Sequence, residues 1–120
     1  MAINMNTSGV HHVSLRVSDL ERSKKFYVET LGFQHLMDAD NICLFLAGGT
    51  AFGLRGPTAE MPRGDKFSPH RVGVDHIALA CSDRSELKRV ADALSPRVGG
   101  RFANAHQHGA RHAALAGTAK

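Results

Sequence analysis

Gly9-Val-His-His-Val-Ser-Leu-Arg-Val-Ser-Asp19 is repeated, with few changes, as Gly73-Val-Asp-His-Ile-Ala-Leu-Ala-Cys-Ser-Asp83. The two stretches are offset by 64 residues (73 − 9), and identical residues recur at that offset in the pairs Gly9/Gly73, Val10/Val74, His12/His76, Leu15/Leu79, Ser18/Ser82, Asp19/Asp83 and Lys24/Lys88. A supersecondary unit too small to bury its own apolar face is normally completed by packing beside its copy. The repeat therefore predicts two related halves, with one copy of the histidine in each.

The composition predicts a single domain over residues 1–120 and argues against nucleic-acid binding. Of the 120 residues, 42% are hydrophobic, enough for one core. The 15 Lys and Arg exceed the 11 Asp and Glu, but four of the basic residues follow Ser95, where no acid occurs: Arg97, Arg101, Arg111 and Lys120. The rest of the chain is balanced at 11 basic and 11 acidic residues, and only one Tyr and six Phe, with no Trp, are available for base stacking.

The cysteines and the N-terminus indicate a reduced, cytoplasmic protein. Cys43 and Cys81 each lie in an apolar, strand-like run, which favours free buried thiols over the alternative of a disulfide. The first residues have neither the basic segment nor the apolar core of a signal peptide. No run approaches membrane-spanning length, so we expect no membrane partner.

The first half reads as β-α-β-β-β. Alternation over residues 10–17 places His12 on the face opposite to the apolar side chains of Val13, Leu15 and Val17. Ser18 precedes Glu21 at capping-box spacing and predicts a helix over residues 20–31. Its stripe should cover the apolar face of the first strand and consists of Ser23, Phe26, Tyr27, Thr30 and Leu31.

Three strands should complete this half, over residues 33–37, 42–47 and 50–55, with a tight turn at Gly48-Gly49. A proline-rich linker follows over residues 57–72. The second half then begins with a strand on which His76 again lies opposite to the apolar residues. Ser82-Asp83 should cap a helix that ends near Leu94 and carries the stripe Leu87, Val90, Ala91 and Leu94.

The first copy of the repeat resembles the start of a module in the vicinal oxygen chelate superfamily. The resemblance continues after the repeat, through Ser18-Asp-Leu-Glu-Arg-Ser-Lys-Lys-Phe-Tyr27 and Leu31-Gly32-Phe33. Val74-Asp-His-Ile-Ala-Leu79 resembles the second start of that superfamily, which contains glyoxalases, extradiol dioxygenases, and fosfomycin and bleomycin resistance proteins. The resemblance covers residues 9–94. It implies an α+β fold of paired β-α-β-β-β modules that form a concave mixed sheet. The first module would be residues 9–56 and the second residues 73–94. We expect the second module to be incomplete, because the tail that follows it, residues 95–120, is atypical.

The resemblance implies a divalent metal ion, Zn, Fe, Ni or Mn, held by His12 and His76 at a site shared by the two halves. Such an ion would polarise vicinal oxygens of a small-molecule substrate in a glyoxalase-type lyase or isomerase, or serve a dioxygenase. We expect weak binding that either histidine-to-alanine substitution abolishes. The alternative is that these are ordinary strand histidines, satisfied by neighbours or water.

The carboxylate that completes the metal site in the resembled family is missing. Its position in the first half lies near Gly53, where no acid occurs, and Glu60 falls in the linker. After Asp92 the chain has no acidic residue at all. This absence favours an alternative function, a metal-free protein that sequesters a drug-like ligand, as bleomycin resistance proteins do. The sequence identifies no catalytic base.

The tail after Ser95 has few strand formers, and we expect it to contribute little ordered β-structure. The spacing of His106, His108 and His112 permits adventitious metal binding, although a solvated stretch is the favoured interpretation. Uncovered sheet edges would seek a partner, so we expect a homodimer, which is also usual in the resembled family. Arg16 and Arg55 are candidates for anchoring an anionic substrate, although a surface role is the favoured interpretation for each. His11 and His35 are interpreted as structural or exposed.

Overall fold

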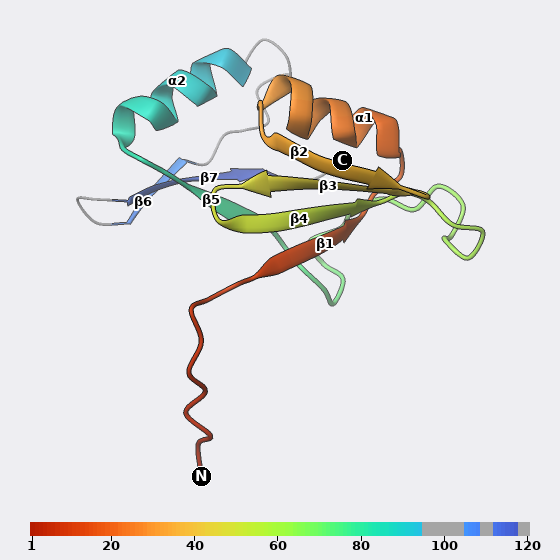
Figure 1. The fold of residues 1–120 in the computed structure, drawn as a ribbon, viewed down its shortest axis with the longest axis horizontal. Coiled ribbons are helices and arrows are strands. Elements are labelled where there is room, and N and C mark those ends of the chain that lie inside the picture. Colours follow the sequence, from red (N-terminus) through yellow and green to blue (C-terminus); the bar gives the residue numbers. More distant parts are fainter. Residues whose placement is uncertain (95–104, 109–111, 118–120) are drawn as a thin grey trace. The chain divides into compact units, whose positions relative to one another are not determined.

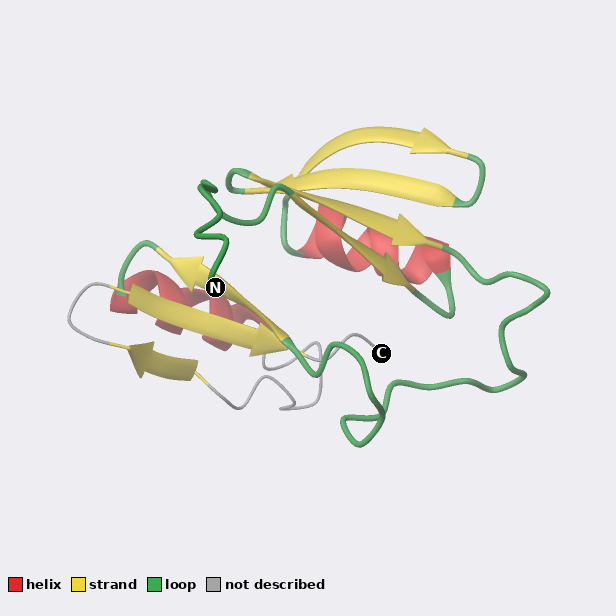
Figure 2. Cartoon of the chain, turned by 90° about the horizontal axis from the view of Figure 1, so that it is seen from below, coloured by secondary structure: helices red, strands yellow, loops and turns green. Residues whose placement is uncertain are grey.

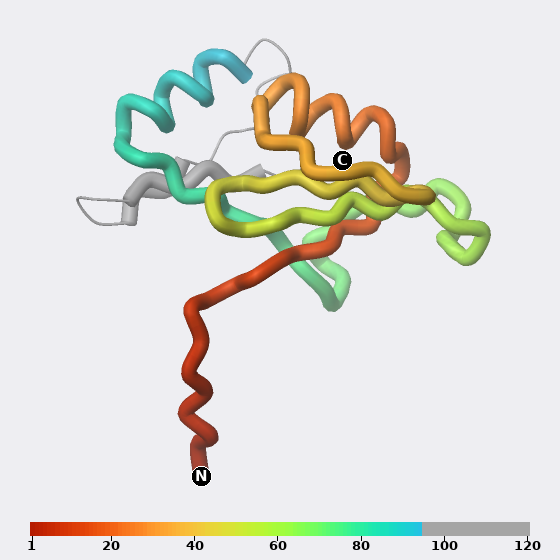
Figure 3. Tube along the Cα trace, viewed as in Figure 1, coloured from red at the N-terminus to blue at the C-terminus, as the bar shows by residue number. Residues whose placement is uncertain are grey.

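The computed structural model describes residues 1–94, 105–108 and 112–117 of the chain (Figure 1). The chain divides into two compact units, Met1–Lys66 and Phe67–Lys120, and each unit is described by itself. The first ten residues are exposed and lead away from the sheet of the first unit, as the chain trace shows (Figure 3). No helix in the described parts of the chain has both the length and the apolar character needed to span a membrane.

The first unit confirms the predicted β-α-β-β-β order. Its elements are β1 (His12–Arg16), α1 (Leu20–Lys24), η1 (Lys25–Thr30), β2 (Gln34–Ala39), β3 (Ile42–Ala47) and β4 (Thr50–Arg55). The four strands form an open, curved, mixed sheet in the order β1-β4-β3-β2, in which β1 is parallel to β4 and the other pairs are antiparallel (Figure 2). The bounds of β3 and β4 agree with the predicted ones, and Gly48 adopts the positive φ of 59° that their tight turn requires.

The helix of this unit covers the predicted residues to within one position, but its capping residue and its winding differ from the prediction. Asp19, rather than Ser18, is the N-cap: its Oδ1 accepts the backbone N–H of Arg22 at 3.0 Å, and its own backbone is extended. Ser18 instead accepts a hydrogen bond from the Arg22 guanidinium. From Lys25 onward the helix is π-wound, with the N–H of Leu31 bonded to the carbonyl of Phe26 at 2.9 Å. Nothing in the sequence marks this wider winding.

The core lies between this helix and one face of the sheet, where Phe45 is 1% exposed. Its ring stacks on those of Tyr27, Phe33 and Phe52, at centroid distances of 4.9, 5.7 and 5.4 Å. Stacked aromatic pairs stabilise beyond their buried area. The predicted helix stripe is confirmed, since Ser23 is buried and the other four residues are half-buried. This packing leaves the opposite face of the sheet free for polar side chains.

The second unit contains β5 (Ile77–Cys81), α2 (Arg84–Leu94), β6 (Ala105–His108) and β7 (His112–Gly117). Its three strands are antiparallel in the order β5-β7-β6. Asp83 caps α2 as predicted, because its Oδ1 accepts the N–H of Glu86 at 2.8 Å. The predicted helix stripe is confirmed, with Leu87 and Leu94 buried and Val90 and Ala91 half-buried. Both cysteines are free, Cys43 buried and Cys81 half-buried.

The strands β6 and β7 differ from the expectation of little β-structure after Ser95. All five residues of β5 pair with β7, from Ile77 with Gly117 to Cys81 with Ala113. Strand pairing is a backbone property, and an unpaired β5 would leave donors and acceptors without partners. The alanine-rich sequence therefore pairs despite its low strand propensity. The rest of the tail, residues 95–104, 109–111 and 118–120, lies outside the described part. The point after residue 94 at which the second module is expected to be incomplete therefore lies outside it too.

Candidate functional site

The exposed face of the first sheet carries the polar residues that the sequence singled out. Along β1 the residues alternate between exposed and half-buried, so His12, Ser14 and Arg16 lie on the exposed side. Their partners in β4 are Ala51, Gly53 and Arg55, in register. The alternation confirms the prediction that His12 faces away from the helix.

Gly53 is packed too closely to accept a side chain without movement of its neighbours. A Cβ atom there would lie 3.2 Å from Cδ2 of Leu44 and 3.5 Å from Oγ of Ser14. The residues that the four strands place on this face by register include no acid: His12, Ser14, Arg16, Gln34, Met37, Ala39, Ile42, Leu44, Leu46, Ala51, Gly53 and Arg55. This face of the first unit therefore supplies one imidazole ligand and no carboxylate ligand.

Two arginines mark one end of the same face. Arg16 and Arg55 are cross-strand partners. Nη1 of Arg16 donates to the carbonyl of Gly56 at 2.7 Å, and Nε of Arg55 donates to Oγ of Ser14 at 3.0 Å. Like charges directly opposite one another are unfavourable in a sheet, and an anion between two guanidinium groups relieves that repulsion.

His12 is bonded through one ring nitrogen to the residue before it. Its Nδ1 lies 2.9 Å from Nδ1 of His11, and the two rings meet edge-on at a centroid distance of 5.1 Å and an angle of 84°. The Nε2 atom of His12 has no hydrogen-bond partner within the described residues. It is therefore the nitrogen open to a ligand.

His76 repeats this arrangement in the second unit. Its Nδ1 lies 2.7 Å from Oδ1 of Asp75, the residue before it, and the two side chains are 59% and 62% exposed. Its Nε2 likewise has no hydrogen-bond partner among the side chains that the structure describes. His76 directly precedes β5 and is exposed, whereas Ile77 and Leu79 in that strand are half-buried. The two histidines belong to separately defined units, so their shared site stays a prediction.

The other sequence candidates lie in other parts of the chain. Glu60 is exposed after β4, outside the sheet. His106 and His108 fall in β6 and His112 in β7, but their side chains are outside the described set. His11 is exposed, as expected, and its contact with His12 was not predicted.

A cluster that the sequence did not reveal lies on the opposite, helix-covered face. Asp38 accepts hydrogen bonds from Lys24 and His35, and these hold the pKa of its carboxyl at about 2, below the usual 3.8. The thiol of Cys43 completes a His/Asp/Cys group whose ligand atoms lie within 4.8 Å of one another. Burial raises the pKa of that thiol, and the Lys24 ammonium already neutralises the carboxylate. The histidine, carboxylate and thiol of this cluster are ligand types that suit zinc. In the structure, however, the carboxylate is held in an ion pair with Lys24.

A bulge in β2 explains why the sequence hid this cluster. Residues three apart in a strand normally lie on opposite faces, but the register shifts between His35 and Met37. The shift brings His35 and Asp38 to one face, where Asp38 pairs with Cys43. Strand alternation alone cannot locate such a shift.

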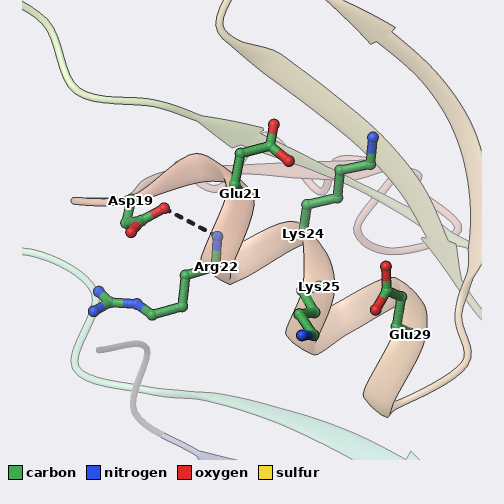
Figure 4. Close-up of a pocket in the computed structure, with 6 residues that line it drawn as sticks. All are labelled: Asp19, Glu21, Arg22, Lys24, Lys25 and Glu29. Atoms are coloured by element: carbon green, nitrogen blue, oxygen red, sulfur yellow. Dashed lines mark hydrogen bonds between the residues drawn. The ribbon is translucent and has the colours of Figure 1, made fainter.

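A surface hollow of about 430 Å³ lies along the helix (Figure 4). Three acidic and three basic side chains line it: Asp19, Glu21, Arg22, Lys24, Lys25 and Glu29. The three negative and three positive charges balance, Asp19 is occupied as the helix cap, and Lys24 is occupied as the partner of Asp38. The hollow therefore lacks the convergent polar groups and apolar walls of a ligand pocket.

Comparison with known proteins agrees with this architecture. The sequence profile of the Glyoxalase/Bleomycin resistance protein/Dioxygenase superfamily matches residues 9–114, which extends through β6 and into β7. No curated protein matches the chain significantly.

Among solved structures, a glyoxalase/dioxygenase from Nostoc punctiforme has a TM-score of 0.56 at 21% identity, covering 89% of this chain and 80% of that one. A lactoylglutathione lyase from Agrobacterium tumefaciens has a TM-score of 0.54 at 18% identity, covering 77% and 72%. A virulence protein from Salmonella typhimurium has 0.52 at 21%, covering 91% and 84%. At these identities the likeness concerns the fold, and the profile match over most of the chain carries the assignment: the chain belongs to the Glyoxalase/Bleomycin resistance protein/Dioxygenase superfamily.

Proposed function

We propose that the chain is a glyoxalase- or dioxygenase-type protein in which His12 and His76 hold a divalent metal ion for a small-molecule substrate. The observation that carries this proposal is the matched state of the two histidines: both are exposed, one in β1 and one directly before β5, and each has Nδ1 bonded and Nε2 open. Imidazole nitrogens suit Zn, Fe, Ni and Mn. When bound, such an ion would act as a Lewis acid toward vicinal oxygens of the substrate.

The chain's own residues would bind and orient the substrate. Arg16 and Arg55 form a cationic end to the exposed face, suited to a carboxylate or another anionic group. The hydrogen bond from Arg55 to Ser14 fixes the direction of that guanidinium. Half-buried Leu44 and Leu46 supply an apolar floor on the same face. The substrate class supported by these groups is a small anionic molecule with an apolar portion.

Calorimetric titration of the metal-free chain with Zn²⁺ tests the proposal. We expect weak binding, because two imidazoles without a carboxylate make an incomplete site, and we expect His12→Ala and His76→Ala each to abolish it. The control is His70→Ala, which removes an exposed histidine from the loop before β5. Tight, stoichiometric binding that survives both site substitutions would place the ligands elsewhere.

The packing around Gly53 favours a second candidate, a metal-free protein that sequesters a ligand. At the position where the resembled family would carry the carboxylate, a Cβ atom would lie 3.2 Å from Cδ2 of Leu44, so a side chain there requires Leu44 to shift. Bleomycin is a suitable probe, titrated before and after treatment of the protein with a chelator. Binding that the chelator leaves unchanged supports sequestration, and binding that it removes supports the metal-dependent function.

Opening the Gly53 position provides a complementary test. The double substitution Leu44→Ala, Gly53→Glu supplies both the space and the carboxylate, and Leu44→Ala alone is its matched control. If the metal binds at His12, we expect the double variant to bind Zn²⁺ more tightly than the control, as a third ligand should. Equal affinities of the two variants would count against His12 as a ligand.

We also propose that the chain forms a homodimer. The sheet of the first unit has unpaired outer edges at β1 and β2 within the described residues, and Leu36 and Met37 in β2 are 44% and 49% exposed. Sedimentation analysis of the chain and of Leu36→Glu tests this: we expect a dimer that the substitution weakens. A monomer at all concentrations would refute the proposal.

A further inference from the structure

We propose that the residue directly before each repeated histidine is a positioning residue: His11 sets the tautomer of His12, and Asp75 sets that of His76. The inference rests on the proposed metal-binding function and adds the groups that prepare the two ligands for it. It is carried by the same contact in both units, since Nδ1 of each histidine is bonded by its predecessor, at 2.9 Å and 2.7 Å.

In the second unit, only one assignment of donor and acceptor is possible for the hydrogen bond between Asp75 and His76. An ionised carboxylate can only accept, so Nδ1 of His76 must carry the proton that Asp75 receives. In the neutral imidazole the other nitrogen, Nε2, then holds the lone pair. Histidine ligands of metals are commonly prepared in this way, with the second ring nitrogen donating to a carboxylate or carbonyl. Asp75 therefore leaves His76 with Nε2 as its ligating atom.

The contact in the first unit admits two directions, and the repeat selects one. Two Nδ1 atoms at 2.9 Å require one donor and one acceptor. If Nδ1 of His12 donates, then His11 carries its own proton on Nε2, and Nε2 of His12 is open for a metal. The reverse assignment would protonate Nε2 of His12 and block it. His11 aligns with Asp75 at the repeat offset, so we assign it the acceptor role.

The two acceptors differ in strength, and this gives the inference a quantitative form. The carboxylate of Asp75 makes a charge-assisted bond, whereas His11 is a neutral acceptor. Charge-assisted bonds are roughly twice as strong as neutral ones. Removal of Asp75 should therefore cost more metal affinity than removal of His11.

The first measurement is the tautomer of each histidine, from long-range nitrogen–proton NMR correlations on the metal-free, full-length chain. The spectra are recorded at about pH 8.5. We expect His12 and His76 to carry the proton on Nδ1, although free neutral histidine prefers Nε2. His11→Ala should return only His12 to the Nε2–H form, and Asp75→Ala only His76. His70→Ala should change neither.

The second measurement is the affinity for Zn²⁺ by calorimetry. Loss of an outer partner of a metal ligand typically costs 10- to 100-fold in affinity. We expect His11→Ala to lie near the lower end of that range and Asp75→Ala near the upper end. His11→Asn and Asp75→Asn keep an accepting oxygen and should restore both the tautomer and most of the affinity.

The outcomes separate this inference from the function on which it rests. Tautomers of His12 and His76 that remain unchanged in His11→Ala and Asp75→Ala overturn the positioning roles, whatever the metal affinity. Tautomer shifts as expected, in a chain that binds no Zn²⁺ in any variant, uphold the positioning roles and refute the proposed metal function.

Discussion

The two units share a beginning and differ in how they are completed. In each, an exposed histidine lies at the start of or directly before the first strand, and a helix with an aspartate N-cap follows, Asp19 in one and Asp83 in the other. The first unit adds three strands that bury Phe45 in a stack of aromatic rings. The second adds β6 and β7, whose sequences contain a single large apolar residue, Leu115. The first strand and helix of each unit position its candidate histidine, while the strands that follow determine how stable that unit is.

Truncation after Leu94 should have the largest effect on this comparison. It removes β7, the strand with which every residue of β5 is paired, and we expect the second unit to lose its folded structure. The first unit has its own core and should remain folded. Hydrogen exchange of the truncated chain measures both outcomes, through protection of β3 and β4 against protection of β5 and α2.

The full-length chain is the control for this truncation. Retained protection of β5 and α2 after truncation would show that the tail is an appendage, as the sequence suggested. Loss of protection in both units would show that they fold as one.

Cavity-forming substitutions should have the next largest effect, and an unequal one. Phe45→Ala removes the central ring of the first core, and we expect it to lower the free energy of unfolding by about 3–5 kcal/mol. Leu87→Ala in the second unit should fall toward the lower end of the range of about 2–5 kcal/mol for such changes. Urea unfolding followed by circular dichroism measures both. Equal losses would contradict the proposed difference between the cores.

Much of the fold could be predicted because strand alternation and helix periodicity are local signals. The strands β3 and β4, the helix stripes and the exposed sides of His12 and His76 all follow from them. The bulge near Leu36 depends on pairing with a neighbouring strand, and the choice of Asp19 over Ser18 as cap depends on backbone angles. Single-residue patterns carry neither kind of information.

The candidate site was predicted less completely than the fold. The repeat pointed to both histidines, and the missing acid near Gly53 was evident from the sequence. The contacts of His11 and Asp75 were not predicted, although their place directly before the repeated histidines was a usable signal. The metal, the shared site and the dimer stay predictions.

The matched helix caps offer a smaller test, in which the two units should respond alike. Asp19→Ala and Asp83→Ala each remove the side-chain acceptor of one backbone N–H in a first helical turn. We expect hydrogen-exchange protection of that turn to fall about fivefold in each case, the factor that corresponds to a typical cap. Asn at either position should restore it. A much larger loss at Asp83 would show that α2 depends on its cap more than α1 does.

The smallest effect should come from the ion pairs of Asp38, which have no counterpart in the repeat. Bonding to Lys24 and His35 lowers the pKa of Asp38 from 3.8 to about 2. A carboxyl with a depressed pKa stabilises the folded state fully above its unfolded pKa, and this stabilisation is lost as the pH falls from about 4 to about 2. Asp38→Asn should reduce the dependence of the thermal unfolding midpoint on pH between about pH 4 and pH 2. Because the group is exposed, the change should be slight, and an unaltered slope would contradict the assigned cause.

The parallel pairing of β1 with β4 has a consequence for the order of folding. Strands β2, β3 and β4 follow one another through short turns, whereas β1 must wait for a strand that ends 39 residues after its own last residue, Arg55 after Arg16. Pairings distant in sequence form slowly because the intervening loop must first be closed. We therefore expect the meander to form early and β1 to dock late. His12 and Arg16 would then come into register with β4 only in the last step, so the candidate site would mature after the rest of the sheet is already stable.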